Sequence, residues 1–126
     1  MQKSTSKLTS QKEKILEIER QRKGLIKLLL SDCEVIEGSF IDVRVRCGRS
    51  GCHCENKPIH PVTRLSWWDN GKLKNKIIRV ADRRWVKKLS DNYKKHRQAM
   101  RDLVKLNEEE KEIIKSVVKL KTRKYE

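Results

Sequence analysis

The sequence predicts an α+β protein, in which a small three-stranded antiparallel sheet with a zinc-binding loop is flanked by an N-terminal helix and a long C-terminal helix. Three observations lead to this fold class. Each end of the chain has a helical hydrophobic period, the middle has a period of two, and a cysteine cluster interrupts the middle. We therefore expect three segments: an N-terminal amphipathic helix at residues 1–32, a zinc-binding β module at 33–81 and a long helix at 82–126.

The first segment has apolar residues at the alternating three- and four-residue spacing of a helix face. This spacing predicts one amphipathic helix over about residues 5–30. Gln11 and Arg22 interrupt its apolar stripe, and Gly24 inside it costs about 1 kcal/mol relative to Ala. The stripe consists of Leu8, Ile15, Ile18, Leu25 and Leu29.

In the middle segment, apolar and charged residues alternate over residues 41–46, as in a strand with one buried face. Two further strands are expected at 62–68 and 74–80. The residues Asp69-Asn70-Gly71 between them predict a tight hairpin turn, because Asn and Gly tolerate positive φ. The three strands should form one antiparallel sheet.

From Asp82, a plausible N-cap, a helical period runs to about Lys121. About 40 helical residues span roughly 60 Å, which is longer than any core that this chain can form. We expect antiparallel packing on the N-terminal helix, with self-association as the alternative, since Asn107 at a seam position can specify register. One heptad position holds Val86, Tyr93, Met100 and Ile114, and the position three residues on holds Leu89, Leu103 and Val117.

Three thiols and two imidazoles lie between Cys47 and His60. Three thiolates and one histidine nitrogen suit tetrahedral zinc, and two glycines let the loop fold tightly around an ion. We expect one zinc ion per chain, which would stabilise the small sheet. The expected ligands are Cys47, Cys52, Cys54 and His60.

Two other ligand choices follow from the same segment. His53 competes with His60 as the fourth ligand, although its position between two ligand cysteines favours a side chain that points away. Free thiols in a loop are the alternative to any metal site.

Cys33 stands apart and is expected to be a small thiol without a metal. Glu55 is the only carboxylate near the ligands, so we expect no enzymatic activity.

The formal charge is +15, and residues 71–101 contain twelve Lys or Arg against two Asp. Such a charge favours a polyanionic partner, and phosphate contacts from it would be independent of sequence. A solvated basic surface without a partner is the simpler interpretation. The cations expected to contact nucleic acid are Arg44, Arg46, Arg49, Lys72, Lys74, Lys76, Arg83, Arg84, Lys87 and Lys88.

The tryptophans have different expected surroundings. Trp67 and Trp68 point to opposite faces of a strand, so one is core and the other is either exposed or covered by a helix. An exposed Trp among cations could stack on a base, although packing under the helix is the favoured interpretation. Trp85 should anchor the long helix in the core.

No apolar stretch approaches the roughly 20 residues needed to span a bilayer, and the N-terminus lacks a secretory signal. The sequence therefore predicts a cytoplasmic protein without a membrane partner. In the cytoplasm, cysteines are more often free thiols or metal ligands than disulfides.

Over residues 37–107 the chain resembles a family of short bacterial proteins of unassigned function, which carry a Cys-Gly-rich motif and are often encoded beside transposases and other mobile elements. The family has Gly and aromatic residues after the His, where this chain has Pro61, Val62 and Thr63. The resemblance supports the metal ligands but implies no reaction. The matching residues are Gly38-Ser39, Arg46-Cys47-Gly48, Cys52, Cys54, His60-Pro61, Leu65-Ser66, Gly71-Lys72, Asn92-Tyr93 and Asn107.

Two functions are expected from these features. The first is a zinc-stabilised accessory module that binds DNA or RNA through sequence-independent phosphate contacts in a mobile-element or nucleoprotein assembly. The alternative is a structural adaptor or oligomerisation protein, which would act on a protein partner or a second copy through its long helices without binding nucleic acid directly.

Overall fold

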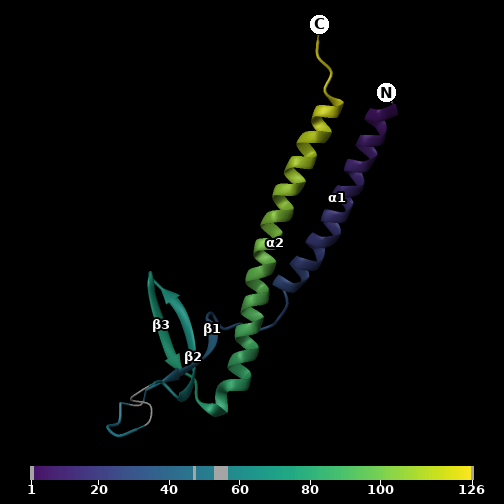
Figure 1. Ribbon diagram of the computed structural model, residues 1–126. Coiled ribbons are helices and arrows are strands. Elements are labelled where there is room, and N and C mark those ends of the chain that lie inside the picture. The colour runs from purple at the N-terminus through teal and green to yellow at the C-terminus, as the bar shows by residue number, and fades with distance from the viewer. Residues whose placement is uncertain (1, 47, 53–56, 126) are drawn as a thin grey trace. The chain divides into compact units, whose positions relative to one another are not determined.

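The structure, a computed structural model, describes residues 2–46, 48–52 and 57–125. It has the predicted α+β fold, with an N-terminal helix, a three-stranded antiparallel sheet and a long C-terminal helix (Figure 1). None of the described helices is long and apolar enough to cross a membrane. The elements are α1 (Gln2–Leu29), β1 (Ser39–Val45), β2 (His60–Asp69), β3 (Lys72–Ile77), the 3-10 helix η2 (Val80–Asp82) and α2 (Arg83–Lys121).

The strands follow the order β1-β2-β3, and each neighbouring pair is antiparallel. The predicted hairpin turn is confirmed: Asn70 and Gly71 both have positive φ, 51° and 80°, and join the paired residues Asp69 and Lys72. Two consecutive positive φ angles are typical of a type I′ turn, whose twist matches that of the flanking strands.

The third strand ends at Ile77, before the predicted end at residue 80. Ile78 still donates its backbone N–H to the Thr63 carbonyl at 2.8 Å. The chain then turns through η2, in which Asp82 N–H bonds to the Arg79 carbonyl at 2.9 Å. The last predicted strand residues therefore form the short connection that leads into α2.

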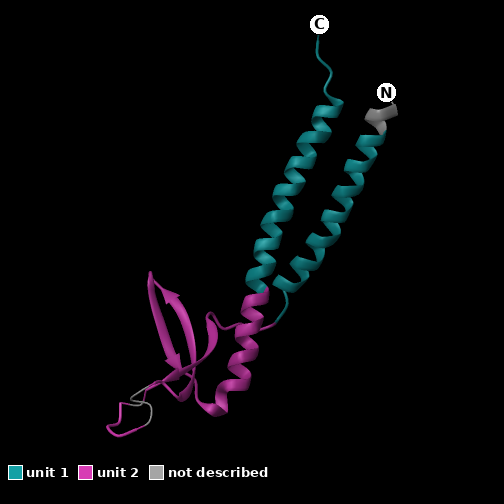
Figure 2. Ribbon diagram, in the orientation of Figure 1, with its two compact units in different colours: residues 1–32, 96–126 teal, residues 33–95 magenta. Residues whose placement is uncertain are grey.

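The chain divides into two compact units, coloured in Figure 2. Unit 1 comprises residues 1–32 and 96–126, which contain α1 and the C-terminal part of α2. Unit 2 comprises residues 33–95, which contain the sheet, η2 and the N-terminal part of α2.

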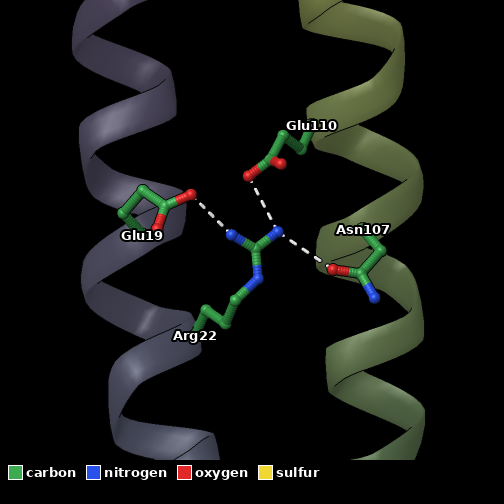
Figure 3. Close-up of polar contacts among 4 residues, drawn as sticks. All are labelled: Glu19, Arg22, Asn107 and Glu110. Carbon is green, nitrogen blue, oxygen red and sulfur yellow. Dashed lines mark hydrogen bonds and ion pairs between the residues drawn. The ribbon is translucent and has the colours of Figure 1, made fainter.

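Unit 1 is a pair of antiparallel helices, as the sequence predicted. In the α1 stripe, Ile18 is only 4% exposed and the other members are half-buried, while Ala99 and Leu106 are buried on α2. Gln11 Nε2 donates to Ser116 Oγ at 3.4 Å, while Arg22 Nη2 donates to Asn107 Oδ1 at 2.9 Å (Figure 3). Gln11 thus contacts the later α2 residue Ser116, whereas Arg22, further along α1, contacts the earlier α2 residue Asn107. The two helices are therefore antiparallel.

The prediction that one heptad stripe is covered along all of α2 is wrong in unit 1. Met100 is 61% exposed and Ile114 is 48% exposed, whereas the neighbouring Ala99 is buried. The buried residues Ala99 and Leu106 are themselves seven residues apart. Within unit 1, the buried heptad position of α2 is therefore the one that precedes the position of Met100.

Unit 2 has a small core between the sheet and the start of α2. Val86 is 6% exposed and Ser90 is fully buried, and Ser90 Oγ donates to the Gly38 carbonyl at 2.8 Å. Thr63, the buried residue of β2, donates from Oγ1 to Asp42 Oδ1 at 2.7 Å. Ser90 thus ties α2 to the residue just before β1, and Thr63 ties β2 to β1.

The expectation that Trp85 lies in this core is wrong. Its side chain is 51% exposed, and its indole Nε1 donates to Asp82 Oδ1 at 3.0 Å. The next residue, Val86, takes the inward position of that helical turn, and one residue along a helix is a rotation of about 100°. The two side chains therefore cannot both face the sheet.

Candidate metal centre and basic surface

Two of the four expected metal ligands lie side by side. Cys52 Sγ is 3.3 Å from His60 Nε2, and both side chains are half-buried. Tetrahedral zinc, with bonds of about 2.3 Å to sulfur and about 2.0 Å to nitrogen, separates such a ligand pair by about 3.5 Å. The spacing between these two atoms therefore fits a shared zinc ion.

Local backbone geometry brings Cys52 to this position. Cys52 N–H bonds to the Arg49 carbonyl at 3.4 Å, which closes a turn over residues 49–52. Gly51, the third residue of this turn, has φ +80°, a value that a type II turn requires and that glycine adopts freely. His60 is held independently, because it is the first residue of β2 and pairs with Val45.

Cys47, Cys54 and the alternative ligand His53 lie outside the described residues, as does Glu55. Within residues 2–46, 48–52 and 57–125, no group of three or more possible metal ligands is present. Cys33 is an exposed free thiol. The complete ligand set therefore stays a prediction, supported by the one pair of side chains described.

The lysines of the predicted basic surface lie on the edge strand β3, every side chain of which is exposed. Lys72, Lys74 and Lys76 alternate along it and so share one face of the sheet. Lys74 Nζ lies 2.6 Å from Asp69 Oδ2, so its charge is partly compensated. Lys72 and Lys76 have no acidic partner among the residues that the structure describes.

Two predicted arginines line the same small cavity between the sheet and the start of α2. Arg44 and Arg83 line it together with Asp42, Pro61 and Thr63. Arg44 Nη1 also donates to the Ile59 carbonyl at 3.1 Å, which ties β1 to the segment before β2. Arg44 therefore has a structural contact in addition to its charge.

The remaining predicted cations are exposed but have different locations. Arg46 and Arg49 flank the cysteine loop, whereas Arg84, Lys87 and Lys88 lie on the first turns of α2. Because Val86 and Ser90 occupy the inward face of these turns, the three helical cations point toward solvent. The basic surface of unit 2 therefore has three parts: the edge strand, the loop flank and the helix start.

Two residues with a role in this surface were missed by sequence reasoning. Asp42 adds a negative charge to the cavity that Arg44 and Arg83 also line, and Arg64 lies on β2 opposite Ile41 and Ile77. Strand alternation could have identified Arg64, which is four residues from Trp68 and so shares its face of the sheet. Strand alternation also places Asp42 on the face of Arg44, whereas the approach of Arg83 to this face depends on how the start of α2 packs and has no local signal.

Comparison with known proteins identifies a family. The family model described as "Domain of unknown function (DUF6788)" matches residues 13–88, which is more than half of the chain. The chain belongs to this family. The DUF6788 match includes the Cys52–His60 pair, all three strands and the beginning of α2. No curated protein and no solved structure matches the chain.

Proposed function

We propose that this DUF6788 protein is a zinc-stabilised nucleic-acid-binding module, with unit 2 as its binding part. The observation that carries the metal half of the proposal is the 3.3 Å separation of Cys52 Sγ and His60 Nε2 at the end of the sheet. Cys47 and Cys54 would complete the ligand set. Bound zinc would fasten the loop to the sheet and add folding free energy to a unit with a small core.

The nucleic-acid half of the proposal is supported by the exposed cations of unit 2. Lys76 on β3 and Arg84 and Lys88 on α2 are all exposed and have no acidic partner in the described part of the chain. Lysine and arginine side chains bind phosphates of any sequence and release counterions when they do so. Contacts of this kind serve DNA and RNA alike.

A biological setting follows from the resemblance to bacterial proteins encoded beside transposases. We propose that the protein is an accessory factor of a mobile-element or other nucleoprotein assembly. A closed ligand set of three thiolates and one histidine would leave no position for a reacting water. We therefore propose binding rather than catalysis.

The salt dependence of binding tests this function. Log affinity for a mixed-sequence duplex should fall linearly with log salt, with a slope of about −0.9 per phosphate contacted. Reversing Lys76, Arg84 and Lys88 to Glu should reduce affinity for all sequences and flatten that slope by roughly one unit per lost contact. Fluorescence anisotropy at several salt concentrations measures both quantities.

The matched control reverses Lys119, Lys121 and Arg123, which belong to unit 1 and are also exposed. It changes the net charge by the same amount and should leave the slope unchanged. Equal losses from both triple variants would mean that the attraction comes from diffuse net charge and not from a site.

A second function, that of a structural adaptor, is favoured by one observation in unit 1. Met100 and Val104, and further along Ile114 and Val118, are exposed apolar pairs on one face of α2, each residue between 48% and 62% exposed. Asn107 and Lys111 separate the two pairs. Exposed apolar residues of this kind are common in helix association. Persistent oligomerisation at high salt, without affinity for DNA or RNA, would replace the first function with this one.

A further inference from the structure

One face of the three-stranded sheet is open to solvent, and we call it the open face. Strand alternation and the observed register place on it one set of side chains from all three strands. The other face carries Thr63, which is buried at 3% exposure against the start of α2. The open face consists of Ser39, Ile41, Val43, Val45, His60, Val62, Arg64, Ser66, Trp68, Leu73, Asn75 and Ile77.

The open face presents large apolar side chains to water. Trp68 is 66% exposed, Leu73 directly opposite it is 53% exposed, and Ile77 is 64% exposed. Trp67 lies on the other face and is half-buried, so the two tryptophans occupy opposite faces as predicted. The favoured interpretation, that the second tryptophan packs under a helix, is wrong for Trp68. Trp68 and Leu73 thus form one exposed apolar pair, and Ile77 lies at the other end of β3, beyond Asn75. Large apolar side chains exposed in this way are typical of a binding surface.

The polar residues of the open face narrow the choice of partner. Ser39, Ser66 and Asn75 form a row across the three strands, in which Ser66 Oγ donates to Asn75 Oδ1. An apolar protein surface laid over this row would bury its hydroxyl and amide groups with incomplete hydrogen bonding, which is costly. The edges of nucleobases would supply donors and acceptors there.

The charges of the open face favour an anionic binding partner. Arg64 lies in the middle strand, and none of the described strand residues on this face is an Asp or Glu. The two strand carboxylates, Asp42 and Asp69, lie on the other face. A second copy of this chain, which also carries a formal charge of +15, would be repelled.

We infer that the open face binds single-stranded nucleic acid, with bases stacked on Trp68 and the backbone near Arg64. The inference rests on the proposed nucleic-acid binding and specifies its substrate class. In a duplex the bases already stack on one another, so a duplex cannot use an exposed indole in this way. In a single strand every base has a free face, and stacking on an aromatic side chain is tolerant of sequence.

The test compares a labelled single-stranded oligonucleotide with a duplex of equal length on the full zinc-loaded chain. Trp68→Leu keeps an apolar side chain but removes the ring, and should weaken single-strand binding by about 5- to 100-fold. Trp68→Phe keeps a ring and should retain most of the affinity. Neither change should alter duplex binding by more than about twofold, since duplex binding uses phosphate contacts.

Trp85→Leu is the matched control, because it removes another half-exposed indole of unit 2 that does not belong to the open face. It should leave single-strand binding unchanged. The inference is overturned if Trp68→Leu binds the single strand as tightly as the natural chain, or if Trp85→Leu weakens binding equally. It is also overturned if Trp68→Leu abolishes oligomerisation of the chain while nucleic-acid affinity stays the same.

Failure of this inference can be distinguished from failure of the proposed function. Salt-dependent duplex binding that persists in every Trp68 variant, with no preference for single strands, refutes the stacking site alone. Absence of binding to either oligonucleotide at low salt refutes both.

Discussion

Gly38 occupies a position in unit 2 that a side chain cannot enter without displacing the sheet. Its φ is +134°, and a Cβ there would lie 2.9 Å from the Ser66 carbonyl oxygen and 3.0 Å from Leu65 Cδ1. Its own carbonyl accepts the hydrogen bond from Ser90 Oγ, which links the sheet to α2. Glycine at this point therefore permits both the backbone angle and the close approach of β2.

Gly38→Ala should lower the unfolding free energy of unit 2 by about 1–3 kcal/mol, through backbone strain and the clash with Ser66. Gly71→Ala is the matched control, since Gly71 also has a positive φ but has open space around its Cβ position. It should cost less, about 1 kcal/mol, from strain alone. Urea titrations followed by tryptophan fluorescence measure both, and equal losses would show that crowding at Gly38 is unimportant.

At the scale of elements, Arg22 makes several of the polar contacts between the two helices of unit 1. Arg22 Nη2 contacts Glu110 Oε2 at 2.7 Å and Asn107 Oδ1 at 2.9 Å on α2, while Nη1 contacts Glu19 on its own helix at 2.5 Å (Figure 3). The hydrogen bond to Glu110 is the main cause that raises the pKa of Arg22 above its ordinary value, followed by the bond to Glu19. A cation whose pKa is higher in the folded chain than in the unfolded chain stabilises the folded state fully at every pH below its unfolded-state pKa. This stabilisation is lost only as the pH rises through the folded-state pKa. The stabilisation by Arg22 is therefore fully present at neutral pH.

Arg22→Ala should lower the melting temperature of the helix pair, because it leaves the half-buried Glu110 without its cation. Arg22→Lys should recover part of the loss, since an ammonium keeps the charge but lacks the planar fork that contacts several acceptors. Arg20→Ala is the control, because the exposed Arg20 pairs only with Glu17 on the same helix among the residues described. Thermal melts followed at 222 nm measure these differences, and an equal shift for Arg20→Ala would contradict the linking role.

At the scale of the whole molecule, the two units can be followed by separate signals. Trp67, Trp68 and Trp85, the three tryptophans of the chain, all belong to unit 2. Helical circular dichroism comes largely from α1 and the C-terminal part of α2, which form unit 1. A metal near Cys52 and His60 should therefore influence fluorescence more than helicity.

Removing zinc with a chelator should change the tryptophan fluorescence sharply and leave most of the 222 nm signal intact, since structural zinc contributes to the folding of its own module. Cys52→Ser and His60→Ala should each reduce the zinc content from one ion per chain and give the same fluorescence change. Cys33→Ser should alter neither quantity, because Cys33 is an exposed thiol. Elemental analysis of the purified variants provides the zinc content, and a normal content in His60→Ala would refute this ligand.

The site could be predicted only in part. The candidate ligands Cys52 and His60, and the lysines of β3, follow from residue types and strand alternation. The pairing of Lys74 with Asp69 and the approach of Arg83 to the cavity lined by Asp42 and Arg44 do not. Each of these depends on the direction of a flexible side chain or on a helix packed across the sheet, and neither has a signature in the neighbouring sequence.

The sequence by itself determined the α+β class, the order of the elements and the Asn70-Gly71 hairpin, because periodicity and turn residues act over a few neighbouring positions. Only the tertiary structure decided which face of α2 is covered in each unit, and that Trp68 and Trp85 are exposed. An amphipathic helix or strand offers more than one apolar face. The face that is buried is selected by contacts between residues far apart in the chain, such as Arg22 with Glu110 and Gly38 with Ser90.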